Sequence, residues 1–328
     1  MTAPSETPPA ARPARILGDV GGTNARFAWQ DDDDAPLRDI VALPTAAHPT
    51  LASALQSYLK RLGRPAPPWC AIGIANPITG DHIQMTNSHW QFSISALQRD
   101  MGFERLVVIN DFTALALALP TLAPSDLRQF GGGPAMPAAP IALIGAGTGL
   151  GVSGLIPDST RKRWIALQGE GGHVTLAAAN AREASVLAVL RDRFGHASAE
   201  RAVSGQGLEA LYVALCQLNG GSGNTALPAE EVSRRAIAAS DPQCVEALEM
   251  FCAFLGNVAG NLALTLGARG GVYVGGGIVP RLGETFMRSR FRASFEDKGR
   301  FRAYLEAIPV FVIEAHVSPA LLGASRAL

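Results

Sequence analysis

The sequence contains two glycine-rich stretches that decide its expected fold, Gly18-Asp19-Val20-Gly21-Gly22-Thr23-Asn24 and Gly145-Ala146-Gly147-Thr148-Gly149-Leu150-Gly151. Apolar runs typical of β-strands flank both of them, at residues 14–17 and 25–29 and at residues 141–144 and 152–156. Each stretch therefore predicts two strands joined by a glycine turn. Because glycine tolerates positive φ and has no Cβ to hold a phosphate away from backbone N–H groups, both turns are suited to binding phosphate. We expect them to bind one polyanion, one turn from each half of the chain.

The remaining pattern predicts a duplicated α/β architecture. The 328 residues are enough for about two domains. The first half predicts helices at 46–62 and 112–119 and strands at 71–75 and 106–109. The second half predicts helices at 181–194, 208–218, 229–239 and 244–266 and a strand at 271–274. Strand pairs followed by helices in each half indicate two α/β domains with a cleft between them.

The charge balance argues against a nucleic-acid-binding protein. The chain has 28 basic and 28 acidic residues, whereas proteins that neutralise many phosphates carry a basic excess. Residues 286–304 mix arginines with aromatic residues, a composition found in single-strand binders. Acidic residues dilute this segment, so we interpret it as a solvated amphipathic surface or a dimer contact. A small anionic ligand, which needs only a local field, stays compatible with zero net charge.

The four cysteines predict core thiols rather than a metal site. Cys70, Cys216, Cys244 and Cys252 form no C-x-x-C pair and have no histidine at metal spacing, so we expect no metal ligated by the protein. Free thiols and the lack of a signal peptide point to a reducing cytoplasm. Proline-rich residues 1–14 are expected to be a disordered tail.

One apolar segment is long enough to be compared with a membrane span. Residues 250–268 carry no charge over 19 residues. Asp241 and Pro242 form a helix start, and Gly256 and Gly260 allow close packing. We therefore predict a soluble helix buried on most sides and no membrane contact.

Two further motifs concern the nucleotide. Residues 149–154 formally match G-x-G-x-x-G, the dinucleotide-binding fingerprint of Rossmann folds. That fingerprint must open a helix, whereas a strand end and a turn follow here, so we reject a Rossmann dinucleotide site. Gly275, Gly276 and Gly277 follow a predicted strand, and they form either a plain turn or a flat backbone surface against a purine. Asp19 either holds Mg²⁺ through water or bonds its own turn.

Four polar side chains form the candidate chemistry. Asp111 follows a strand and is either a helix N-cap or the base that accepts a proton from a hydroxyl attacking a phosphoryl group. Glu170 and His173 flank two glycines, and a carboxylate and an imidazole can together bind vicinal hydroxyls. The alternatives for His173 are a turn histidine and a zinc ligand. Glu200 either reaches the same pocket or is a solvated residue at a helix start.

Taken together, these motifs resemble the ATP-dependent bacterial glucokinase family, which belongs to the superfamily of actin, other sugar kinases and the heat-shock ATPases. The matching pieces occur in family order from residue 15 to the C-terminus: residues 17–26, 85–87, 109–112, 145–151, 169–173, 198–201 and 275–277. The chain lacks the cysteine-rich zinc motif of the related repressor and kinase family, and no DNA-binding helical pair precedes the first strand. These differences favour the glucokinase branch.

The resemblance implies a role for each matching position. Asp111 would be the general base for the 6-hydroxyl of glucose, and Asn110, Asp111, Glu170, His173 and Glu200 would bind the sugar. The ATP phosphates would be bound by Gly18, Asp19, Val20, Gly21, Gly22 and Thr23 and, on the opposite side, by Gly147 and Thr148. Gly275, Gly276 and Gly277 would face adenosine. Mg²⁺ would be held mainly through the phosphates and water.

The resemblance also implies an architecture: a two-domain actin-like, ribonuclease H-like α/β fold with a central cleft. Residues 15–112 would form the small domain, residues 113–317 the large domain, and residues 318–328 would return to the small domain. The implied protein is a cytoplasmic glucokinase, a homodimer by family expectation, acting at the entry of glycolysis. A catalytically idle sugar sensor, a kinase for another hexose or an amino sugar, and ADP or polyphosphate as donor remain alternatives at this point.

Overall fold

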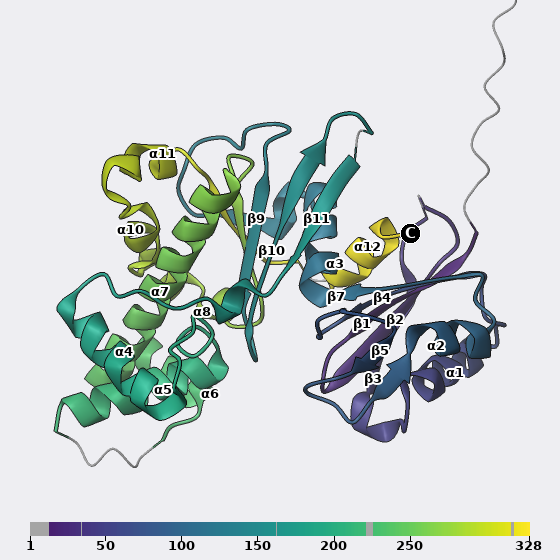
Figure 1. Ribbon diagram of the computed structural model, residues 1–328, viewed down its shortest axis with the longest axis horizontal. Coiled ribbons are helices and arrows are strands. Elements are labelled where there is room, and N and C mark those ends of the chain that lie inside the picture. Colours follow the sequence, from purple (N-terminus) through teal and green to yellow (C-terminus); the bar gives the residue numbers. More distant parts are fainter. Residues whose placement is uncertain (1–12, 34, 162, 221–225, 316–317) are drawn as a thin grey trace, which may run out of the picture. The chain divides into compact units, whose positions relative to one another are not determined.

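The computed structural model describes residues 13–33, 35–161, 163–220, 226–315 and 318–328 (Figure 1). These residues form two compact units, each built around its own sheet. The first unit contains the described residues up to Thr121 together with those from Ser318 onward, and the second unit contains the residues between them. Most of the predicted N-terminal tail, residues 1–12, lies outside the described residues.

The first unit has a five-stranded sheet in the order β3-β2-β1-β4-β7. Its strands β1, β2 and β3 are antiparallel, whereas β1, β4 and β7 are parallel. Their bounds are β1 (Arg15–Val20), β2 (Asn24–Gln30), β3 (Arg38–Pro44), β4 (Trp69–Ile74) and β7 (Arg105–Asn110). The unit also has the hairpin of β5 (His82–Gln84) and β6 (Gln91–Ser93) and the helices α1 (Leu51–Leu62), α2 (Ile94–Met101), α3 (Asp111–Ala118) and α12 (Pro319–Arg326).

The second unit has a six-stranded sheet in the order β11-β10-β9-β12-β13-β8. The strands are β8 (Leu127–Gln129), β9 (Ile141–Ala146), β10 (Leu150–Asp158), β11 (Arg163–Gly169), β12 (Val272–Gly275) and β13 (Val310–Ile313). The helices are α4 (Ala181–Phe194), α5 (Gly205–Leu218), α6 (Ala229–Ile237), α7 (Pro242–Leu266), α8 (Val279–Leu282), α9 (Glu284–Arg288), α10 (Phe291–Glu296) and α11 (Arg302–Glu306).

The two sheets repeat one topology. In each unit an antiparallel hairpin around the glycine turn (β1–β2 or β9–β10) is extended by a third antiparallel strand. On the other side of the hairpin's first strand, two parallel strands follow in the order β4-β7 or β12-β13. Strand β8 is the addition that is specific to the second unit. The predicted duplication of an α/β half is therefore confirmed at the level of topology.

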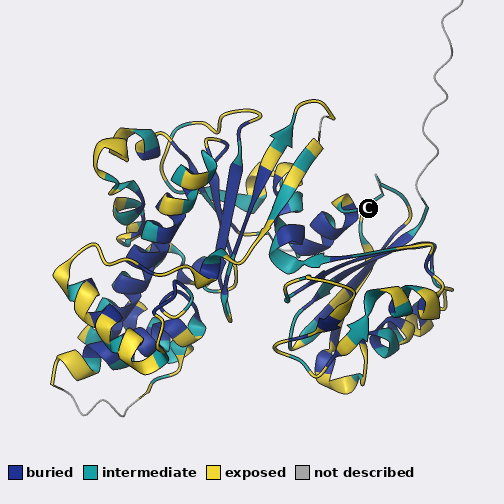
Figure 2. Ribbon diagram, viewed as in Figure 1, coloured by how far each residue is buried: buried dark blue, intermediate teal, exposed yellow. Residues whose placement is uncertain are grey.

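The long helix α7 forms the centre of the second core (Figure 2). Asp241 caps it, with Oδ1 accepting from the backbone N–H of Gln243 at 3.0 Å, and Pro242 is its first residue. Gly256 and Gly260 let α10 approach, because a Cβ would lie 2.1 Å from the carbonyl oxygen of Phe291 and 2.5 Å from that of Phe295. Among the described helices, α7 is long and apolar enough to cross a membrane, but 72% of its most apolar window is buried. That burial is typical of a core helix.

The interpretation of residues 286–304 as a solvated surface is wrong for three of their aromatic residues, whereas Phe301 is exposed as expected. Phe286, Phe291 and Phe295 are buried in the core of the second unit. The Arg292 guanidinium donates to backbone carbonyls, including that of Ile308 at 3.0 Å and that of Leu305 at 3.1 Å. The arginine therefore fixes the chain that leads into β13, because its guanidinium donates to several backbone carbonyls of that chain.

The cysteines are free, as predicted. Cys70, Cys244 and Cys252 are buried, and Cys216 is half-buried. Burial raises the pKa of the Cys252 thiol to about 12. Burial also raises the pKa of Cys244 to about 12, with a further contribution from Asp241. The burial of Cys70, Cys244 and Cys252 confirms their interpretation as core residues, and thiols with raised pKa values are unreactive.

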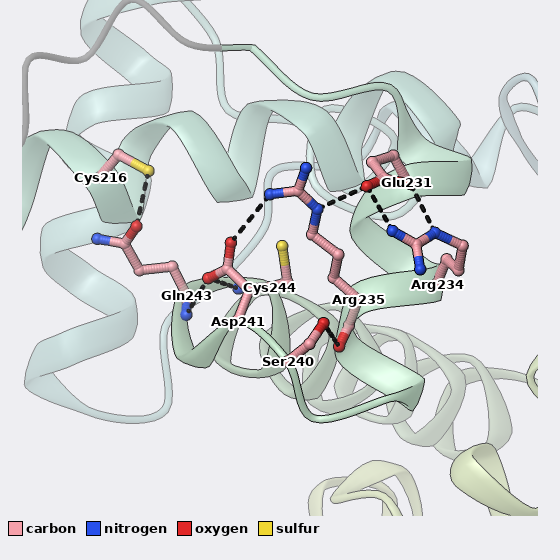
Figure 3. A network of polar contacts seen from close by, with 8 residues as sticks. All are labelled: Cys216, Glu231, Arg234, Arg235, Ser240, Asp241, Gln243 and Cys244. Atoms are coloured by element: carbon pink, nitrogen blue, oxygen red, sulfur yellow. Dashed lines mark hydrogen bonds and ion pairs between the residues drawn. The ribbon is translucent and has the colours of Figure 1, made fainter.

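A polar network joins the start of α7 to α6 (Figure 3). Arg235 Nη1 lies 3.6 Å from Asp241 Oδ2, and its Nε donates to Glu231 Oε1 at 2.6 Å. Arg234 binds the same carboxylate in a bidentate manner, at 2.7 and 2.8 Å. The hydrogen bonds from Arg234 and Arg235 lower the pKa of Glu231 to about 2. This network orients α6 against α7.

The division between the units falls after Thr121, whereas the sequence analysis placed it after residue 112. The difference comes from α3, which packs against α12 within the first unit (Figure 1). Gly323 of α12 makes this packing possible, because its backbone lies against the carbonyl of Ala114 in α3.

Candidate active site

The first glycine turn is shaped by close backbone contacts. Gly21 N–H donates to the Asn24 carbonyl at 2.9 Å and closes the turn between β1 and β2. A Cβ on Gly22 would lie 2.4 Å from the carbonyl oxygen of Asn87. The segment that contains Asn87 therefore packs directly on the turn, and only glycine fits at residue 22. Gly21, Gly22 and Thr23 remain at least partly exposed, so their backbone groups can be reached by a ligand.

The parallel strands of the first unit end together beside this turn. Val20, Ile74 and Asn110 are the last residues of β1, β4 and β7 and stand in register with one another. The carboxyl edge of parallel strands is where α/β proteins bind their ligands. A Cβ on Gly73 would lie 3.0 Å from that of Ala114 and 3.6 Å from Cα of Asp111. Because Gly73 has no side chain, α3 can begin close against the sheet.

Asn110 and Asp111 have different structural roles. Asn110 caps α3, because its Oδ1 accepts from Phe112 N at 2.9 Å and from Thr113 N at 3.1 Å. Its Nδ2 donates to the Asn76 carbonyl at 3.4 Å. Asp111 is the first residue of the helix and is half-buried. The N-cap alternative considered for Asp111 is therefore wrong, since the residue before it holds that position.

Asp19 is the second-to-last residue of strand β1, and its side chain is only 16% exposed. Its Oδ2 accepts from Ser318 Oγ at 2.7 Å and lies 3.4 Å from Arg26 Nη1. These contacts contradict the alternative in which the Asp19 side chain hydrogen-bonds to its own turn. Both partners come from outside the turn.

In the second unit the two remaining glycine motifs lie side by side. Gly145 of β9 pairs with Gly275 of β12, and a Cβ on Gly145 would lie 2.6 Å from the Gly275 carbonyl carbon. Gly276 has a φ of +82°, and a Cβ there would lie 2.3 Å from the Ala146 carbonyl oxygen. The structure therefore joins the turn at Gly147 to the turn at residues 275–277. Gly276 and Gly277 are exposed.

Glu170, His173 and Glu200 are brought to one place in the second unit. Glu170 and His173 lie at the two ends of the short helix η4 (Gly171–His173), and both are exposed. Glu200 N–H donates to the Gly172 carbonyl at 2.8 Å, which joins its segment to this helix. Glu200 Oε2 accepts from Leu150 N at 2.9 Å. Glu200 is therefore tied to the second glycine turn and is not a solvated residue at a helix start.

A small pocket of about 20 Å³ joins Glu200 to Thr148 and to the start of α5. Gly205, the first residue of α5, donates its N–H to the Gly147 carbonyl at 2.9 Å. The N-terminus of a helix favours negative charge nearby, which suits a turn expected to contact phosphate.

A larger cavity of this unit, about 310 Å³, lies elsewhere. It is lined in part by Glu183, Asn257 and Arg290, and Glu183 already accepts from Ala179 N at 2.7 Å as part of the cap of α4.

No functional role was expected from the sequence for Asn76, Thr86 or Ser318. Asn76 Oδ1 accepts from both Thr86 N and Thr86 Oγ1 at 3.1 Å, which fixes the loop next to Asn110. The Asn-Pro step at residues 76–77, after a strand, is a signal that could have marked this loop. Ser318 has no local signal, because it lies 299 residues from its partner.

Comparisons with known proteins agree with these motifs. A family model described as Glucokinase matches residues 16–328. The chain belongs to the glucokinase family. It is 54% identical to the glucokinase of Chromobacterium violaceum, over 96% of this chain and 89% of the relative. It is 55% identical to the glucokinase of Aromatoleum aromaticum, over 96% of this chain and 94% of the relative.

Solved glucokinase structures share the fold. A glucokinase from an Antarctic psychrotroph matches with a TM-score of 0.87 and 34% identity, over 97% of this chain and 99% of that one. A ROK family glucokinase from Streptomyces griseus, in complex with glucose and AMPPNP, matches with a TM-score of 0.63 and 20% identity, over 96% of this chain and 98% of that one. The fold is thus the two-sheet, actin-like α/β fold that the resemblance implied.

Proposed function

We propose that this protein is a glucokinase that transfers the γ-phosphoryl group of ATP to the 6-hydroxyl of D-glucose. The observation that carries the proposal is the match of the glucokinase model to residues 16–328, at 55% identity to a glucokinase of similar length. The products are glucose 6-phosphate and ADP, and the reaction is an entry step of glycolysis.

Asp111 is the proposed general base. It stands at the start of α3, beside the carboxyl edge of β1, β4 and β7, where α/β proteins bind ligands. The sugar hydroxyl must lose its proton as the new P–O bond forms, and a positioned carboxylate accepts that proton. The cap formed by Asn110 supports this role because it fixes the first turn of α3.

The proposed sugar ligands are Asn110, Asp111, Glu170, His173 and Glu200. Exposed Glu170 and His173 present a carboxylate and an imidazole from one short helix, which suits vicinal hydroxyls. The hydrogen bond from Leu150 N to Glu200 Oε2 holds the Glu200 carboxylate close to Glu170 and His173.

The proposed phosphate ligands are the backbone groups of residues 18–23 and of Gly147 and Thr148, with residues 275–277 facing adenosine. The contact of Gly22 with Asn87 supports this, because a turn held so closely keeps its N–H groups in one arrangement. The start of α5 beside Gly147 adds a favourable field for negative charge.

The residues present fit a hydrated Mg²⁺ at Asp19, whose carboxylate stands beside the glycine turn and is a hard oxygen ligand. When bound, the ion neutralises charge on the ATP phosphates. We further propose that the two units are the small and large domains, that the protein acts in the cytoplasm, and that it forms a homodimer.

A coupled assay of ADP formation tests the proposal. Asp111→Asn keeps the shape of the side chain and removes the proton acceptor, so kcat falls by at least about 10²-fold while the Kd for glucose stays near the wild-type value. Asp100→Asn, at an exposed position of α2 in the same unit, is the matched control and leaves kcat unchanged.

Three outcomes separate the alternatives. A chain that binds glucose without forming ADP is a sensor rather than a kinase. A higher kcat/KM with another hexose or an amino sugar changes the proposed substrate. Faster turnover with ADP or polyphosphate than with ATP changes the proposed donor.

A further inference from the structure

Ser318 occupies the N-cap position of α12 but does not cap that helix. A serine at this position ordinarily accepts a hydrogen bond from the backbone N–H two or three residues later. Ser318 makes no such bond to its own helix. Its hydroxyl instead donates to Asp19 Oδ2 at 2.7 Å. The usual capping bond is thus exchanged for a contact with the proposed phosphate site.

Within the described part of the chain, this contact is the shorter of the two that hold the Asp19 carboxylate. A hydroxyl that donates to a carboxylate forms a charge-assisted hydrogen bond, which is stronger than a neutral one. Arg26 Nη1 lies 3.4 Å away, and the Arg26 side chain is 47% exposed, so solvent screens that ion pair. Both contacts fall on Oδ2, and Oδ1 takes part in neither. Ser318 therefore decides how Oδ1 is oriented.

The helix that carries Ser318 is held firmly in the first unit. Leu321 and Ala324 are fully buried and pack in one cluster with Leu17, which precedes Asp19 by two residues on β1. At the other end of the helix, Ser325 Oγ donates to Gln30 Oε1 at 2.7 Å. Because α12 is fixed at several points, its first residue can hold the Asp19 side chain in one rotamer.

We infer that Ser318 is a positioning residue for the phosphoryl transfer. It holds the Asp19 carboxylate by Oδ2, so that Oδ1 would be left for the hydrated Mg²⁺ that accompanies the nucleotide. The inference rests on the proposed function, and it adds a residue of the last helix to the nucleotide site. Ser318 acts through Asp19 and contacts no reacting atom.

Three variants test the inference. Ser318→Ala removes the hydroxyl, Ser318→Thr keeps it, and Ser325→Ala removes a hydrogen bond of the same length from the same helix. We measure the binding of ADP by calorimetry over a series of Mg²⁺ concentrations, together with kcat and both KM values. The binding experiment needs no turnover, so it reports on the nucleotide site directly.

Ser318→Ala is expected to weaken ADP binding about 10-fold at a limiting Mg²⁺ concentration, the size found when an outer partner of a metal ligand is removed. The difference shrinks when Mg²⁺ is omitted, and the Kd for glucose stays within about 2-fold of the wild-type value. Ser318→Thr restores the wild-type dependence on Mg²⁺. Ser325→Ala lowers Tm without changing that dependence.

The inference is overturned if Ser318→Ala binds ADP as the wild type does at every Mg²⁺ concentration. It is also overturned if Ser325→Ala shows the same weakening, because the effect is then a general loosening of α12. A wild-type protein that does not phosphorylate glucose contradicts the proposed function instead, and the binding series still decides the role of Ser318.

Discussion

The packing of α12 on α3 gives a sharp test through Gly323→Ala. A Cβ at residue 323 would lie 1.5 Å from the carbonyl oxygen of Ala114 and 2.5 Å from its carbonyl carbon. Real Cβ atoms come no closer than 3.0 Å to such atoms, so the helices must separate by at least 3.0 − 1.5 = 1.5 Å. Both contacting groups are backbone, and neither can rotate away.

The cost follows from this displacement. Overpacking a well-packed core costs about 1–3 kcal/mol, and contacts to backbone fall at the upper end of that range, about 3 kcal/mol. At about 2–4 °C per kcal/mol, we expect Tm to fall by roughly 6–12 °C. Because α3 begins with Asp111, its displacement also moves the proposed base. A misplacement of about 1 Å costs about 10²-fold in kcat.

Differential scanning calorimetry and the coupled assay measure the two effects. Gly80→Ala is the matched control, because residue 80 belongs to the same unit, lies in open space and has no positive φ. Surface changes of this kind stay within about 0.5 kcal/mol of the wild type. If Gly323→Ala matches Gly80→Ala in both Tm and kcat, the close backbone approach of α12 and α3 does not exist.

Two further variants test the glycine turn and the polar network. Gly22→Ala places a Cβ 2.4 Å from the Asn87 carbonyl oxygen, which displaces the glycine turn. We therefore expect the KM for ATP to rise by at least about 10-fold, while the KM for glucose rises much less. If steady-state kinetics show an equal rise in both KM values, the assignment of this turn to ATP is wrong. Glu231→Gln removes a carboxylate whose pKa in the folded protein, about 2, lies below its ordinary 4.5. The ion pairs therefore stabilise the fold fully above pH 4.5 and lose this effect as the pH falls toward 2. In thermal scans across pH, the gap in Tm between wild type and variant should be widest near neutrality and close in acid; a gap independent of pH would refute the assigned pKa.

The elements that the sequence predicted well are those with local signals. The β1–β2 and β9–β10 hairpins follow from apolar strands on either side of glycine turns, and both are present. The start of α7 follows from Asp241 and Pro242, and Gly256 and Gly260 indicated close packing of this helix, although not that α10 is its partner. Each of these features is decided by a few neighbouring residues, so the pattern alone indicates it.

The sequence was a poor guide where distant segments meet. The aromatic residues near Phe291 were taken for a surface because arginines alternate with them, but Arg292 is satisfied by carbonyls from other segments. The contact of Ser318 with Asp19 has no signature in either segment. The position of Glu200 was open for the same reason, since its partner Leu150 belongs to another element. Tertiary partners, rather than local propensity, decide these residues.

The first unit is assembled from segments that leave the ribosome at very different times. Its opening hairpin is made early, whereas the serine that bonds to Asp19 follows 299 residues later. At about 5–20 residues per second, that interval lasts roughly 15–60 s. Until the last helix emerges, the apolar patch around Leu17 that it covers stays open on the growing chain. Synthesis therefore imposes a waiting period in which this apolar surface of the first unit has no α12 to cover it.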